Sequence, residues 1–108
     1  GRYGMISSAS DLASMIGLKV LEEGGNAVDA AVAVGFALAV TYPEAGNLGG
    51  GGFMVIHLAN GKNTTIDFRE TAPSFVNQNI YLNDSGKVIK DMSRTGWTSS
   101  GVPGTVAG

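Results

Sequence analysis

Cysteine is absent from this 108-residue chain, and histidine occurs once, as His57. Without cysteine the chain can form no disulfide, perform no thiol chemistry and offer no thiolate to a metal. A single histidine with no second strong ligand argues against metal binding. A Ser-His-acid triad stays open by count alone, although no serine lies in a nucleophile elbow. We therefore interpret His57 as a packed or edge-facing strand residue.

Charged residues are also sparse, at 15% of the chain, and the net charge is −2. No basic patch is visible, which argues against nucleic acid as a partner. No apolar run approaches the ~18 residues of a membrane-spanning helix. Residues 1–5 contain no apolar core of a secretion signal.

Glycine, by contrast, is abundant, with 17 residues, about twice the usual share of ~7%. Four of them form the run Gly49–Gly52. A phosphate-binding loop runs from strand to helix and ends in Gly-Lys-Ser/Thr, whereas this run leads from a helix to a strand and no lysine follows. We favour a tight turn that lets another segment approach closely, with direct ligand contact as the alternative. Either way the run can border an active site.

Two helices are expected in the first 40 residues. The first spans Ser8–Glu23, with Ser8 as the N-cap, Asp11 in the first turn and apolar residues at helical spacing. Gly24 and Gly25 end it.

The second expected helix runs from Ala27 to about Val40, with Asn26 as its N-cap and Asp29 in its first turn. After Asp29 every residue to Val40 is apolar or glycine. A helix that is apolar on all sides is expected to be buried on all sides. The helix therefore needs more protein around it than one small hairpin supplies.

A β-hairpin is expected next, with strands at residues 53–58 and 64–68 joined through Asn60-Gly61, a strong hairpin signal. Arg69 lies at the exit of the second strand, between Asp67 and Glu70 on either side. Such an arginine is commonly the ion-pair partner of its acidic neighbours. Its planar guanidinium also suits a bidentate clamp on a substrate carboxylate.

The remaining residues carry weaker signals. Residues 74–100 are expected to be largely irregular, with a short helix or turn at residues 80–82. Residues 101–108 are typical of a loop that opens a helix, and their apolar character leads us to interpret the chain as incomplete.

Four separated stretches resemble one known family: residues 24–33, 43–53, 67–73 and 101–108. In this order and spacing they resemble the large-subunit portion of γ-glutamyltranspeptidases. The resemblance covers nearly the whole chain. Any one stretch alone would be a weak signal, but the four together are highly specific.

The resemblance implies an α+β fold of the N-terminal-nucleophile hydrolase type, an αββα sandwich. Residues 1–108 would be a single, incomplete N-terminal portion of the large subunit, comprising two helices and a β-hairpin. The family implies a precursor that cuts itself into a large and a small subunit, so the expected partners are the rest of the large subunit and the small subunit. It also implies a periplasmic or extracellular location, and no metal or cofactor.

In this family the small subunit's N-terminal threonine is the nucleophile, and it cleaves γ-glutamyl amides such as glutathione. The acyl group then passes to water or to an amino acid or peptide. No catalytic residue is expected in this chain, and Thr105 lies in an interior motif. The one role that carries over is that of Arg69, which by resemblance binds the α-carboxylate of the γ-glutamyl group.

Two alternatives remain. A glutaryl-type (cephalosporin) acylase on the same scaffold would also present a carboxylate to Arg69, but no α-amine. The chain could instead act alone as a structural or binding module, which the apolar second helix argues against.

Overall fold

The first helix, α1, spans Asp11–Glu22 in the computed structural model, which describes residues 1–108. The expected start at Ser8 is wrong, because the N-cap is Ser10, whose side chain accepts the N–H of Ala13 at 3.4 Å. The carbonyl of Ser10 also accepts the first helical hydrogen bond, from Ser14 at 2.9 Å. Ser8 donates its hydroxyl to that same carbonyl at 2.8 Å, so it supports the cap from outside the helix.

The turn after α1 is a glycine C-cap, as predicted. Gly24 has a φ of +96°, a conformation that glycine adopts without steric cost. Its N–H donates to Leu21 at 3.1 Å, and the N–H of Gly25 donates to Val20 at 2.9 Å. This pair of bonds is the Schellman motif, and it satisfies carbonyls that the helix end would otherwise leave free.

The second helix, α2, spans Ala27–Thr41 and begins with the predicted Asn26 cap. The Asn26 side chain accepts the N–H groups of Val28 at 2.7 Å and Asp29 at 3.2 Å. The Asp29 carboxylate in turn accepts the N–H of Asn26 at 2.8 Å. This reciprocal capping box fixes the start of α2 with residues that are adjacent in sequence.

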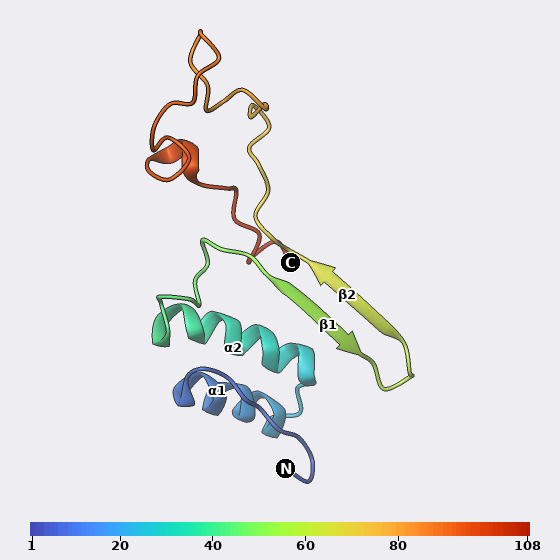
Figure 1. Ribbon diagram of the computed structural model, residues 1–108. Helices are drawn as coiled ribbons and strands as arrows, with labels where there is room; N and C mark the ends of the chain where they lie inside the picture. Colours follow the sequence, from blue (N-terminus) through green and yellow to red (C-terminus); the bar gives the residue numbers. More distant parts are fainter.

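The two helices lie side by side, and small residues let them approach closely (Figure 1). A Cβ atom added to Gly17 of α1 would lie 2.6 Å from Cγ2 of Val34 in α2, so glycine is needed at this contact. The chain buries only four residues, all at this interface: Ala13, Gly17, Ala30 and Val34.

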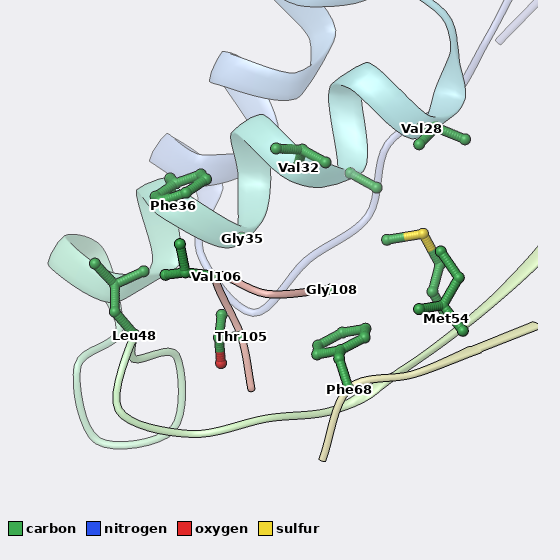
Figure 2. A pocket seen from close by; sticks show the side chains of 12 residues that line it. Val28, Val32, Gly35, Phe36, Leu48, Met54, Phe68, Thr105, Val106 and Gly108 are labelled. Atoms are coloured by element: carbon green, nitrogen blue, oxygen red, sulfur yellow. The ribbon is translucent and has the colours of Figure 1, made fainter. Parts of the chain in front are cut away.

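The expected burial of α2 on all sides stays a prediction, because it depends on more protein than these 108 residues, which leave much of α2 exposed. Val32 is 48% exposed, Phe36 50% and Val40 81%. The reason is that α1 packs closely against only one side of α2. The opposite side faces the hairpin across an open groove (Figure 2). No helix is both long enough and apolar enough to cross a membrane.

The predicted hairpin is confirmed, with β1 at Phe53–His57 and β2 at Asn63–Asp67. The strands are antiparallel, and Phe53 faces Asp67 across the ladder. The turn is closed by two hydrogen bonds, from Leu58 to the carbonyl of Lys62 at 2.9 Å and from Gly61 to that of Leu58 at 2.8 Å. Gly61 supplies the positive φ, +81°, that this turn requires.

Residues 72–100 form an irregular arm that extends away from the helices and returns to the base of the hairpin (Figure 1). Its regular structure consists of a 3₁₀ helix, η1, at Trp97–Ser99, and an isolated antiparallel bridge between Leu82 and Val88. A bridge between Thr71 and Val102 closes the base of the arm. The radius of gyration is 18.6 Å, against about 13 Å for a compact domain of this length, so the elements do not enclose a common core.

Candidate functional site

Arg69 lies two residues beyond the end of β2 and forms an ion pair with Asp67. Its Nε donates to Oδ1 of Asp67 at 3.1 Å, and its Nη2 donates to Oδ2 at 2.9 Å. The backbone N–H of Arg69 also donates to Oδ1, at 3.1 Å. The ion-pair interpretation of Arg69 is therefore confirmed, and the carboxylate is paired in the bidentate geometry that the guanidinium favours.

The guanidinium also lies over the ring of Phe53, with its Cζ atom 4.8 Å from the ring centroid. Phe53 is the cross-strand partner of Asp67. The register of the hairpin therefore lets the Asp67 carboxylate and the Phe53 ring contact the same guanidinium. The side chain of Arg69 nevertheless stays 61% exposed. It borders a polar hollow lined by Asp67, Arg69, Glu70 and Thr71. The site is thus an oriented cation that remains open to solvent.

Each partner of this pair favours the charged form of the other. The side-chain hydrogen bond from Arg69, followed by its backbone hydrogen bond, holds the pKa of Asp67 below the ordinary value. The same side-chain hydrogen bond raises the pKa of Arg69. Because the folded pKa of Asp67 is depressed, any stability from the pair is complete above about pH 4 and is lost as the pH falls through the lower folded value.

Three glycines from distant parts of the chain surround the backbone of residues 68–70, and we call Gly51, Gly101 and Gly104 the glycine collar. A Cβ on Gly51 would lie 2.5 Å from the carbonyl oxygen of Phe68 and 2.7 Å from Cα of Arg69. One on Gly104 would collide with the same oxygen, and one on Gly101 would lie 2.9 Å from Cβ of Glu70. Only glycine fits at these contacts, so the collar holds the segment that carries Arg69.

Hydrogen bonds tie the collar together. The carbonyl of Gly50 accepts the N–H groups of Gly104 at 2.9 Å and Thr105 at 3.1 Å. Thr71 and Val102 exchange two backbone bonds, of 3.1 and 2.9 Å. The interpretation of Gly49–Gly52 as a point of close backbone approach is therefore confirmed.

The other candidate residues lie apart from Arg69. His57 ends β1 at the far end of the hairpin, where its Nδ1 is 2.7 Å from Oδ1 of Asn63. Thr105 uses its hydroxyl to donate to the carbonyl of Asn47 at 3.4 Å. Histidine and acidic side chains do not gather in groups of three or more that could hold a metal ion.

An apolar groove of about 350 Å³ separates α2 from the hairpin and the C-terminal turn (Figure 2). Phe68 and Met54 reach into it from the hairpin, opposite Val32 and Phe36 of α2. Sequence analysis missed this apolar face, although the sequence contains a signal for it. Ile66 and Phe68 alternate with Asp67 and Arg69 at the spacing of a strand with two different faces. One face of this strand therefore presents the Arg69 site and the other an apolar surface.

Comparisons with known proteins agree on one family. The family model described as Gamma-glutamyltranspeptidase matches residues 13–108. The chain is 59% identical over 105 residues to a glutathione hydrolase proenzyme of Pseudomonas sp. (strain A14), covering 97% of this chain and 18% of that protein. It is 55% identical over 107 residues to the glutathione hydrolase proenzyme of Escherichia coli (strain K12), covering 99% of this chain and 18% of that protein.

A solved structure agrees as well. The chain superposes on the crystal structure of Helicobacter pylori gamma-glutamyltranspeptidase with a TM-score of 0.92 and 59% identity, covering 100% of this chain and 31% of that one. The chain spans about a fifth of the length of the curated relatives that it matches.

Proposed function

The chain belongs to the gamma-glutamyltranspeptidase family, and from this premise we propose that Arg69 binds the α-carboxylate of a γ-glutamyl substrate. The supporting observation is the state of the guanidinium. It is held on one edge by Asp67 and on one face by Phe53, yet it remains 61% exposed beside a polar hollow. An oriented, always-charged cation open to solvent suits the bidentate recognition of a carboxylate.

We further propose that the chain contributes binding to an enzyme whose bond-breaking groups lie on other segments. The expected fold of the whole is the αββα sandwich of N-terminal-nucleophile hydrolases, with residues 1–108 as the front of its large subunit. The small subunit would supply an N-terminal threonine as the nucleophile. Thr105 is not a candidate for this role, because its nitrogen is a backbone amide, which donates to the carbonyl of Gly50 at 3.1 Å, and not a free α-amine.

The proposed reaction has two halves. The threonine hydroxyl gives up its proton to the threonine's own α-amine as its oxygen attacks the γ-carbonyl carbon, the amide C–N bond breaks, and the leaving amine takes up that proton. Water or an amino acid then attacks the γ-glutamyl ester and releases the threonine. Arg69 would act throughout by holding the α-carboxylate, so its contribution is to substrate positioning rather than to proton transfer.

A glutaryl acylase would use Arg69 in the same way, since both acyl groups present a carboxylate. The naming of the 59% and 55% identical relatives as glutathione hydrolase proenzymes favours the γ-glutamyl substrate. We also propose that the whole protein is located in the periplasm or the extracellular space.

The test is to replace Arg69 by alanine and by lysine in the complete protein. Losing one charge-assisted contact should lower kcat/KM for a γ-glutamyl anilide by about 10- to 150-fold, and we expect a loss no smaller than this range. Self-cleavage into two subunits should proceed largely as before, because Arg69 acts on substrate. Arg94→Ala, a change in the irregular arm, serves as the matched control. Unchanged kcat/KM in both Arg69 variants would contradict the proposal.

A further inference from the structure

The Arg69 guanidinium has two edges on which a carboxylate can bind in bidentate fashion, and Asp67 occupies only one. Nε and Nη2 form the occupied edge, with hydrogen bonds of 3.1 and 2.9 Å to the two oxygens of Asp67. A guanidinium carries five N–H donors. Two of them point at Asp67, which leaves one hydrogen of Nη1 and one of Nη2 on the outer edge, while the second hydrogen of Nη1 points back toward Cδ. This outer edge has the right shape for a second carboxylate.

Asp67 is in turn fixed by the backbone. Its Oδ1 accepts the N–H of Arg69 at 3.1 Å as well as the Nε hydrogen, so one oxygen joins main chain and side chain of the same residue. The carboxylate therefore sets the direction of the guanidinium relative to the backbone that the glycine collar holds. Phe53 covers one face of the guanidinium plane, with Cζ 4.8 Å from the ring centroid. Asp67 therefore occupies one edge of the guanidinium and Phe53 one face. These two contacts fix the direction in which the outer edge points.

Asp67 has two opposed effects on a substrate carboxylate. It orients the donors in advance, which removes rotamer entropy that a free arginine would lose on binding. It also adds a negative charge close to the place where the substrate charge would lie. Asp67 and Arg69 are both more than half exposed, at 54% and 61%, so water and salt screen that repulsion. Orientation does not depend on the dielectric and should dominate.

Building on the proposed role of Arg69, we propose that Asp67 is a positioning residue that reserves the outer, Nη1–Nη2 edge of Arg69 for the substrate α-carboxylate. Its contribution is specific to substrates that carry this group. A substrate that lacks the α-carboxylate makes no use of the outer edge and is indifferent to how Arg69 is oriented.

The experiment compares two anilides in the complete protein: the γ-glutamyl anilide, and the 4-aminobutyryl anilide, which keeps the amine and lacks the α-carboxylate. In Asp67→Ala we expect KM for the γ-glutamyl anilide to rise by about 5- to 30-fold, the range set by the rotamer entropy of one arginine. The kcat/KM for the 4-aminobutyryl anilide should stay unchanged. Asp67→Asn, which keeps the shape of the side chain and one acceptor oxygen, should show the same selectivity with a smaller rise. Asp84→Ala in the arm is the matched control.

A double variant gives a second readout. Because Asp67 acts through Arg69, Asp67→Ala combined with Arg69→Ala should be no worse than Arg69→Ala alone. Equal losses on both anilides in Asp67→Ala and Asp67→Asn would indicate a general structural role and overturn the inference. Improved use of the γ-glutamyl anilide would overturn it too, because charge repulsion would then dominate.

The two proposals fail in different ways. If Arg69→Ala abolishes the preference for the γ-glutamyl anilide while Asp67→Ala and Asp67→Asn leave it intact, only the role of Asp67 is wrong. If Arg69→Ala itself leaves the preference intact, the proposed function of Arg69 is wrong, and the role of Asp67 is wrong with it.

Discussion

The pair of helices, α1 and α2, and the junction where the glycine collar holds the Arg69 segment differ in how far apart along the chain their contacting residues lie. Each end of α1 and α2 is fixed by residues a few positions away, as in the capping box of Asn26 with Asp29. The junction instead joins residues 47–51, 68–71 and 101–105, and one of its hydrogen bonds links residues 58 positions apart, Thr105 and Asn47. Local signals build the scaffold, whereas the geometry of the candidate site depends on contacts between distant segments.

The largest effect should come from filling the collar. Gly104→Ala would press a methyl group against the carbonyl oxygen of Phe68, and Gly51→Ala would place one 2.5 Å from the same atom. Since both collisions involve backbone, we expect a loss of about 1–3 kcal/mol of stability for each, with Gly104→Ala the more severe. Thermal unfolding of the complete protein measures the loss.

The matched control lies within the same glycine run. A Cβ on Gly49 would meet only the side chain of Asn47, at an ordinary 3.5 Å, so Gly49→Ala should change stability by no more than about 0.5 kcal/mol. Equal effects of Gly49→Ala and Gly51→Ala would mean that close approach to residues 68–70 is not what demands glycine.

A smaller effect is expected at the helical end of the comparison. Asn26→Ala removes the bonds to Val28 and Asp29, and we expect a loss of about 1 kcal/mol in the free energy of unfolding. Ser10→Ala removes only one long bond of 3.4 Å and should cost less. Urea denaturation of the complete protein measures both, and neither change should alter the KM for a γ-glutamyl anilide. A larger loss in Ser10→Ala than in Asn26→Ala would contradict this account of the caps.

Sequence reasoning succeeded where neighbours along the chain decide the structure. The end of α1 at Gly24, the start of α2 at Asn26 and the hairpin through Gly61 all follow from local chemistry. The start of α1 was misplaced because Ser8 and Ser10 both offer a capping hydroxyl, and only the backbone conformation of Ser10 selects between them.

The candidate site was predictable in part. The position of Arg69 after the second strand and the acid two residues before it could be read from the sequence. The stacking on Phe53 depends on the exact register of the hairpin. The collar could not be foreseen, because nothing local reveals that Gly104 returns to touch Phe68. The exposure of α2 in this chain could not be predicted from the sequence either, because composition describes what a helix can bury and not which segments are there to cover it.

The most direct test of the central claim is a crystal structure of the complete protein with glutamate bound. The account predicts that the α-carboxylate oxygens lie about 2.7–2.9 Å from Nη1 and Nη2 of Arg69, while Asp67 keeps its bonds to Nε and Nη2. It would be contradicted by a glutamate whose α-carboxylate is held by other groups while Arg69 remains paired with Asp67 alone.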